Sequence, residues 1–261
     1  MILGSHRRWR GSAGALALAL ALCGCWDSGK APVTKPDPQP GLTADSPVKA
    51  VRLLEWCWQN RDLARYDELV TDDFLFCCAA NDSAGNAFRA HELTRFDEIE
   101  IARHLFVGGG ISPPANIITL QFDRNLIPQQ DSRAGKQDPT YFQEITTSVV
   151  LRIRTDVEEF QVTGAARFFL ARGDSALIPA ELVARGFRAD PGHWYIQRWE
   201  DETVGSGPIA NSAVRARGGA WLAARRSGSE GSRALSQDAV QSPPLDVTWG
   251  FVKRVFYPTG R

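Results

Sequence analysis

The chain has 261 residues, of which 43% are hydrophobic and 10% aromatic, a composition typical of a globular protein with one domain's worth of core. Its formal net charge is zero, but residues 46–204 carry 17 Lys and Arg against 24 Asp and Glu, whereas residues 205–261 carry 8 against 3. The acidic central part argues against a nucleic-acid-binding face on the domain, because neutralising phosphates needs clustered basic side chains. The basic C-terminal part is interpreted as a solvated extension, with contact to anionic lipid or nucleic acid as the alternative.

The N-terminus combines a cationic start, a short apolar run and a cysteine motif: Arg7, Arg8 and Arg10, then residues 11–22, then Leu22-Cys23-Gly24-Cys25. The run is about a dozen residues, whereas a bilayer needs roughly 20. The motif resembles the lipobox of bacterial lipoproteins, in which a small residue directly precedes the acylated cysteine. Residues 1–24 are therefore predicted to be a lipoprotein signal peptide and Cys25 the lipidation site. Cys23 fits less well, because Leu22 would then take the small-residue position. An ordinary secretory signal is the alternative.

The lipobox implies a cell-envelope protein whose partner is the membrane itself, held there by several acyl chains such as palmitate, since one chain binds only weakly. We expect the domain to face the periplasm in a Gram-negative-type cell. Residues 25–45 contain the lipidated cysteine and a stretch rich in Pro, Asp, Ser and Gly. They predict an extended linker that separates the acidic domain from the membrane.

Three cysteines remain in the mature chain, Cys57, Cys77 and Cys78, and the envelope is oxidising. An odd number allows at most one internal disulfide, between Cys57 and either of the other two. The favoured alternative is that they are buried free thiols. No Cys and His residues have the spacing of metal ligands, so we predict no metal site and no cofactor.

Residues 46–204 are interpreted as one domain that begins with helices. Ser46-Pro47 is a typical helix start, and apolar residues follow at helical spacing as far as Trp58. Asp62 is expected to cap a second helix that includes Tyr66 and ends at Asp72-Asp73, and residues 74–79 form a short strand candidate. Thr94 and Asp97 resemble a capping box for a third helix near 94–107, which Gly108-Gly109-Gly110 stops.

Strands dominate the rest of the domain. Apolar and polar residues alternate over 118–122, 144–153, 160–170 and 194–199. This period of two predicts an antiparallel sheet with one buried face. Two strands are long enough to suggest a strongly bent sheet, and Gly164 is a candidate bend or bulge within one of them.

The order helix, helix, short strand, helix and four long strands resembles the nuclear-transport-factor-2-like fold, which includes SnoaL-like proteins. The resemblance is carried by residues 66–74, 94–107 and 194–199. It implies an α+β fold in which a curved antiparallel sheet wraps around helices as a cone with an apolar pocket. Members include isomerases, dehydratases, polyketide cyclases and non-catalytic binding domains, so the fold does not give the function.

Catalytic members use a carboxylate or His base inside the cone, with a Tyr or an acid that stabilises an oxyanion. The candidates for such roles are Tyr66, Asp97 and His104. Asp97 and His104 are seven residues apart and should point the same way from the third helix. Structural roles are the alternative to catalytic ones. The carboxylates of Asp97 and Glu98 would stabilise the N-terminus of the third helix, and Tyr66 would pack in the core.

The last part of the chain is divided in two. Residues 205–244 are rich in Gly, Ser, Arg and Ala and are predicted to be disordered. Residues 245–261 form a short amphipathic segment in which Trp249, Val252 and Phe256 recur at helical spacing. It is interpreted as a helix that docks back onto the domain or a partner, with a helix lying on the membrane as the alternative.

The favoured function is a lipid-anchored, non-catalytic domain that binds a small apolar ligand or an envelope protein. It rests on the lack of a recognisable acid–base set in the predicted strands. The alternative is an enzyme of the isomerase, dehydratase or cyclase type that uses a carboxylate or His base in the apolar pocket.

Overall fold

A computed structural model describes residues 42–174, 176–203 and 244–258. The signal peptide, the lipobox with Cys25, nearly all of the linker and the stretch 205–243 lie outside these residues, so what we expect of them stays a prediction. Within the described ranges, no helix is long and apolar enough to cross a membrane.

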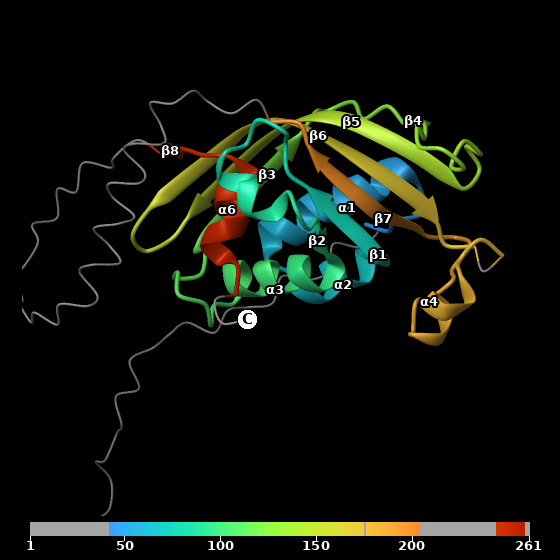
Figure 1. Cartoon of the computed structure of the whole chain (residues 1–261), viewed down its shortest axis with the longest axis horizontal. Coiled ribbons are helices and arrows are strands. Elements are labelled where there is room, and N and C mark those ends of the chain that lie inside the picture. Colours follow the sequence, from blue (N-terminus) through green and yellow to red (C-terminus); the bar gives the residue numbers. More distant parts are fainter. Residues whose placement is uncertain (1–41, 175, 204–243, 259–261) are drawn as a thin grey trace, which may run out of the picture. The chain divides into compact units, whose positions relative to one another are not determined.

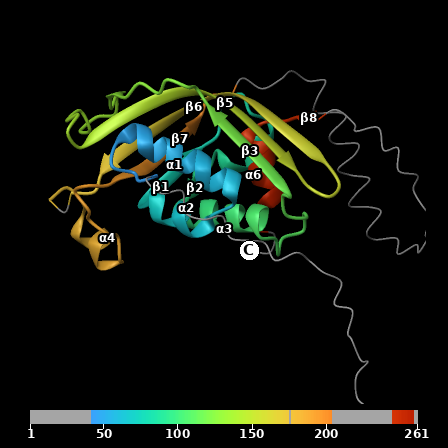
Figure 2. The same ribbon diagram turned by 180° about the vertical axis from the view of Figure 1, so that it is seen from behind.

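Among the described residues, the framework is a sheet of eight strands in the order β2-β1-β7-β6-β5-β3, with β4 paired to β5 and β8 to β6. The strands are β1 (Val70–Cys77), β2 (Leu93–Thr94), β3 (Ile117–Phe122), β4 (Gln129–Gln130), β5 (Phe142–Arg154), β6 (Glu159–Arg172), β7 (Trp194–Asp201) and β8 (Leu245–Asp246). Figures 1 and 2 show the long strands β5 and β6 bending over the helices. The expected α+β class with a strongly curved sheet is confirmed.

The helices lie mainly on one face of this sheet (Figure 1). They are α1 (Pro47–Asn60), α2 (Leu63–Leu69), the 3-10 helix η1 (Ala84–Phe88), α3 (Arg95–Phe106), α4 (Ala180–Ala184) and α6 (Trp249–Phe256). The expected caps are present: Ser46 caps α1, Asp62 caps α2, and Thr94 forms a reciprocal capping box with Asp97 on α3.

The boundary between α2 and β1 differs from the prediction. Helix α2 ends at Leu69, and Val70, Thr71 and the two aspartates after them belong to the strand. Val70 and Thr71 are β-branched, which favours extended backbone, and Val70 pairs with Ile196 of β7. The β1–β7 pair is parallel, so the sheet is antiparallel except at this pair and at β6–β8.

The predicted bulge at Gly164 is absent from the pairing of β5 with β6, where the register runs unbroken and Val149 lies opposite Gly164. A Cβ atom at position 164 would lie closer than 3.0 Å to Thr203. Glycine is therefore needed because another segment approaches closely, not because the strand takes up an extra residue.

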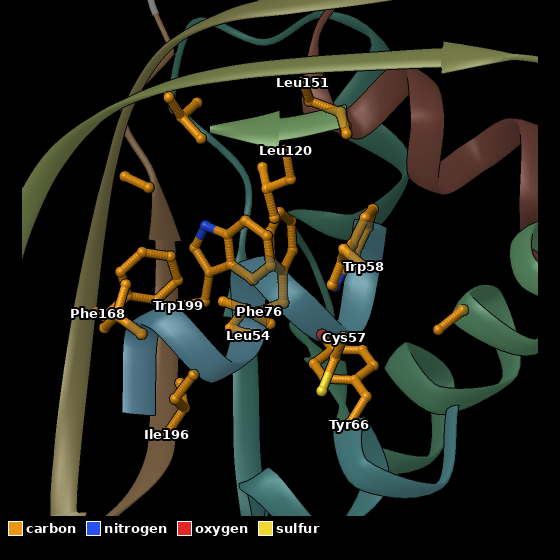
Figure 3. Close-up of a cluster of buried hydrophobic side chains, with 14 of the residues drawn as sticks. Leu54, Cys57, Trp58, Tyr66, Phe76, Leu120, Leu151, Phe168, Ile196 and Trp199 are labelled. Carbon is orange, nitrogen blue, oxygen red and sulfur yellow. The ribbon is translucent and has the colours of Figure 1, made fainter. Parts of the chain in front are cut away.

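The core between α1 and the sheet is aromatic. Figure 3 shows Leu54 and Trp58 of α1 close to Phe76 of β1 and Trp199 of β7.

Cys57, on the same helix, is a buried free thiol, and Cys77 and Cys78 are free as well. The three thiols are therefore unpaired as expected, but only Cys57 is buried, whereas Cys77 and Cys78 are half-buried; burial raises the pKa of Cys78 to about 12.

The C-terminal segment docks onto the domain rather than projecting from it. Helix α6 buries Trp249, Val252 and Phe256 in the common core, and β8 pairs in parallel with β6. Of the two interpretations of this segment, the structure therefore agrees with docking onto the domain.

Candidate functional site

The candidate site lies where α6 meets α1, α3, β1 and β7. Four aromatic rings, from Trp58, Phe76, Trp199 and Trp249, surround one point and are called here the aromatic box. Their ring centroids are 4.6 Å apart for Trp199 and Trp249, 5.4 Å for Phe76 and Trp199, and 5.5 Å for Trp58 and Trp249. Edge-to-face contacts of this kind stabilise a core beyond the area that they bury.

Lys253 of α6 places its ammonium group inside the aromatic box. Its Nζ atom lies 4.6 Å from the ring centroid of Phe76, 5.2 Å from that of Trp199, 5.3 Å from that of Trp58 and 5.6 Å from that of Trp249. The residue is 0% exposed. Aromatic rings attract a desolvated cation by about 2 kcal/mol or more, which offsets part of the cost of taking the ammonium out of water.

Glu98 of α3 supplies the opposite charge. Both of its carboxylate oxygens lie 2.5 Å from Lys253 Nζ, and both side chains are 0% exposed. The Tyr66 hydroxyl donates a 2.6 Å hydrogen bond to Glu98 Oε1. Burial, and then the Glu98 carboxylate, raise the pKa of Tyr66 well above its usual value. Tyr66, Glu98 and Lys253 thus form one network, called here the ion network, in which the tyrosine keeps its proton.

The N-terminus of α6 is held by Asp82, a fully buried carboxylate in the loop before η1. Its Oδ2 accepts a 2.8 Å hydrogen bond from the backbone N–H of Gly250, and its Oδ1 accepts a 2.7 Å bond from the Thr248 hydroxyl. A negative charge here also stabilises the positive end of the helix dipole. A Cβ atom at position 250 would lie closer than 3.0 Å to Asp82 and to the backbone of Gly85, so only glycine fits.

The other end of α6 is held by α3 and the loop after it. Nδ1 of His104 lies 3.0 Å from the carbonyl oxygen of Phe256, and the Ser112 hydroxyl donates to the carbonyl of Val255. Because a carbonyl oxygen only accepts, the proton of His104 is on Nδ1, and Nε2 accepts from Arg103 at 2.9 Å. Tyr257, just past the helix, donates to Asp97 at 3.2 Å.

The structure places three of the four predicted site residues, Tyr66, Asp97 and His104. Asp97 and His104 do point the same way, toward the segment that ends α6, where Asp97 also closes the capping box of α3. Tyr66 lies within the ion network. Cys25 lies outside the described residues.

Glu98 and Lys253 were not predicted as a pair. The periodicity does put Glu98 on the apolar face with Ile101 and Leu105, and Lys253 between Trp249 and Phe256 on theirs. A charged residue at an apolar position is the signal that marks each of them, but neither position identifies the other as its partner.

A second, more open site is a cleft of about 430 Å³ bordered by α2, β1, β7 and the segment that follows α4, called here the α4 cleft. Charges of both signs line it: Arg95 pairs with Asp67 at 2.8 Å, and Arg185 pairs with Asp72 at 3.0 Å. Its histidine, His193, has its pKa lowered by burial. The cleft is polar, unlike the interior site.

The solved structures that this chain resembles are only distantly similar to it in sequence. No family model matches the chain, and no curated protein matches it. A nuclear-transport-factor-2-like protein of unknown function from Rhodospirillum rubrum is 14% identical over 60% of this chain and 97% of its own, with a TM-score of 0.38. A nuclear-transport-factor-2-like superfamily protein from Salmonella enterica is 10% identical over 62% and 90%, with a TM-score of 0.39.

A protein provisionally named a scytalone dehydratase, from Novosphingobium aromaticivorans, is 10% identical over 59% of this chain and 78% of its own, with a TM-score of 0.39. These similar structures therefore include one that is named after an enzyme and one of unknown function. We take the function of this chain from the contacts of its own residues.

Proposed function

We propose that this protein is a lipid-anchored cell-envelope protein whose folded unit binds a ligand or another protein and does not catalyse a reaction. The main support is the closed ion network. Both oxygens of Glu98 are used by Lys253, and Tyr66 donates its proton to the same carboxylate. A general base must be free to accept a proton from a substrate, and Glu98 in this network is not.

The interior site is the place where we expect the ligand. Its walls are aromatic and its polar groups are few and convergent, which is typical of small-molecule sites. Helix α6 covers it, and Lys253 fills its centre. The chain's own C-terminal helix thus occupies the position that a ligand would take in the apolar cone.

The enzyme alternative keeps one supporting observation, a buried tyrosine 2.6 Å from a buried carboxylate. Were the domain an isomerase, a dehydratase or a cyclase, Glu98 with Tyr66 would be its acid–base pair. Asp97 and His104 are engaged in holding the helix ends.

The anchor is tested by growing cells with an alkyne-tagged palmitate and isolating the full chain. We expect the wild type to be labelled and to fractionate with membranes, and Cys25→Ser to lose both properties. Cys23→Ser is the matched control and should keep the label, because Cys23 leaves with the signal peptide. Label that persists in Cys25→Ser contradicts the anchor.

Catalysis is tested with the purified full chain and a panel of isomerase, dehydratase and cyclase substrates, assayed well below the melting temperature of each variant. We expect no turnover that depends on Glu98, and a rise in melting temperature with compounds that bind. Turnover that Glu98→Gln abolishes, while its circular dichroism stays that of the wild type, contradicts the proposal.

A further inference from the structure

The ammonium group of Lys253 is surrounded as a bound ligand would be, by two carboxylate oxygens at 2.5 Å and four aromatic rings within 5.6 Å. We propose that Glu98, Tyr66 and the three rings of the aromatic box outside α6, those of Trp58, Phe76 and Trp199, form a binding site for a primary alkylammonium group. Helix α6 fills this site with its own Lys253, and the site accepts the ammonium of another molecule when α6 withdraws. The inference rests on the proposed binding function and names its ligand chemistry.

The chemistry of the site selects a charged donor that carries N–H groups. The two oxygens of Glu98 accept hydrogen bonds from the ammonium, and the rings attract its charge. A quaternary ammonium has no N–H to donate, and a neutral alcohol has no charge. The Tyr66 hydroxyl donates a hydrogen bond to the same carboxylate.

Most of the site does not belong to the helix that fills it. Trp58 comes from α1, Tyr66 from α2, Phe76 from β1, Glu98 from α3 and Trp199 from β7. Of the aromatic box, only Trp249 would leave together with Lys253. The other rings are held by contacts away from α6: Trp58 packs on Phe106 at 5.5 Å, and Phe76 on Trp199 at 5.4 Å.

Helix α6 is suited to leave and return. It has eight residues, fewer than the roughly 12–15 that an isolated helix needs to be stable in water, so its helical form depends on its packing against the domain. The whole stretch 204–243 separates it from β7 in the sequence. The strand that precedes it, β8, pairs with β6 over only two residues.

The first test replaces the resident cation in the full chain. Lys253→Ala removes the atoms of n-propylammonium, so we expect its melting temperature to fall by roughly 10 °C and to recover by at least half as n-propylammonium is added in the millimolar range. Recovery should saturate with concentration, as binding to the folded state requires. Lys49→Ala is the matched control, since Lys49 is exposed and pairs with the exposed Asp45, and it should show no recovery.

Comparison compounds decide what the recovery means. At equal concentrations, 1-propanol and tetramethylammonium should leave Lys253→Ala unchanged. Adding Glu98→Gln to Lys253→Ala should abolish the recovery by n-propylammonium. Equal recovery with 1-propanol, or no recovery with the amine, overturns the proposal.

The second test needs no variant. Hydrogen exchange of the amides at 249–256 is measured in the wild type with n-propylammonium or with N-acetyl-lysine methylamide, each at concentrations that saturate Lys253→Ala, or up to 0.5 M if that variant does not fold. We expect exchange there to accelerate at least threefold while α1 and β5 stay protected, and the more potent probe identifies a free amine or a lysine side chain as the source. No acceleration with either probe overturns the proposal.

The two proposals fail separately. A missing recovery and unchanged exchange would leave a binding domain with a ligand of another chemistry. Turnover that depends on Glu98 would remove the binding function and leave the ammonium recovery as it is.

Discussion

Helices α4 and α6 are both short, yet none of the five residues of α4 is buried, whereas five of the eight residues of α6 are. Helix α4 follows Pro179 without a side-chain cap, and its C-cap residue Arg185 pairs with Asp72 across the α4 cleft. Helix α6 is capped by Thr248, and both of its ends are bound by side chains of the domain. The same kinds of charge pair accompany both helices.

The two helices differ in the solvent exposure of their charge pairs. The side chain of Arg185 is 65% exposed, so its attraction to Asp72 is weakened by water and salt. Lys253 and Glu98 are 0% exposed, so each depends on the other for its charge to be tolerated. The exposed charge pair at α4 therefore contributes little to stability, whereas the buried charge pair at α6 decides whether that helix can pack against the domain.

The largest effect that we expect comes from breaking the buried pair. Glu98→Gln keeps the shape of the side chain but leaves Lys253 without a charged partner, which should cost about 3 kcal/mol of unfolding free energy. Glu100→Gln is the matched control, because the same substitution on the same helix affects a partly exposed pair with Arg103, and it should cost less than about 1 kcal/mol. Urea denaturation of the full chain measures both. Equal losses would mean that burial does not set the value of these pairs.

The next effect tests whether α6 is seated as described. Gly250→Ala should lower the unfolding free energy by about 2 kcal/mol, because the new methyl group would meet Asp82 and the backbone of Gly85. The sign is diagnostic: in a helix without that contact, alanine would stabilise by up to about 1 kcal/mol relative to glycine. Arg254→Ala, at an exposed position of the same helix, should change little. A stabilised Gly250→Ala would show that α6 is not packed on Asp82.

Much of the fold could be predicted from local patterns. The caps at Ser46, Asp62 and Thr94, and the alternation along β5 and β6, depend on residues that are close in the sequence. The start of β1 could not, because Val70 also continues the apolar side of α2 and only its pairing with Ile196 decides between helix and strand. The reason for Gly164 lies in Thr203, nearly forty positions away.

The candidate site was less predictable than the fold for the same reason. Periodicity placed Tyr66 in the core and the aromatic residues of α6 on one face, and both predictions agree with the structure. It could not show that Lys253 meets Glu98, since the two are 155 positions apart and belong to separate helices. A charged residue on an apolar face shows that a partner exists, but only tertiary packing shows which residue it is.

A third prediction concerns Asp201 at the end of β7, near the α6 end of the sheet. Burial raises the pKa of Asp201 from 3.8 to about 6. A carboxyl group whose pKa is raised in the folded state adds stability that is fully present below about pH 3.8 and is lost as the pH rises through about 6. This loss is on the order of 3 kcal/mol. Asp201→Asn cannot ionise, so its melting temperature relative to the wild type should rise between pH 4.5 and 7.5.

The control for this pH dependence is a carboxyl shifted the other way. The backbone N–H of Ser148 lowers the pKa of Asp123, so Asp123 stabilises the fold when it is ionised, and this contribution is lost as the pH falls. The melting temperature of Asp123→Asn should therefore fall further below that of the wild type at pH 7.5 than at low pH. The same pH trend in both variants would mean that the trend comes from the whole molecule and not from these two groups.

The smallest effect is expected at the α4 cleft, and it completes the comparison of the two helices. Arg185→Ala removes the pair with Asp72 at 3.0 Å and should cost less than about 1 kcal/mol, because exposed pairs contribute little. Raising the NaCl concentration from 0.05 to 0.5 M should shrink that difference further, since salt screens exposed charges. The loss in Glu98→Gln should stay nearly constant, because no solvent reaches its partner. If salt reduces both losses by the same fraction, water reaches the ion network. The surface on which α6 packs would then be as open to solvent as the α4 cleft.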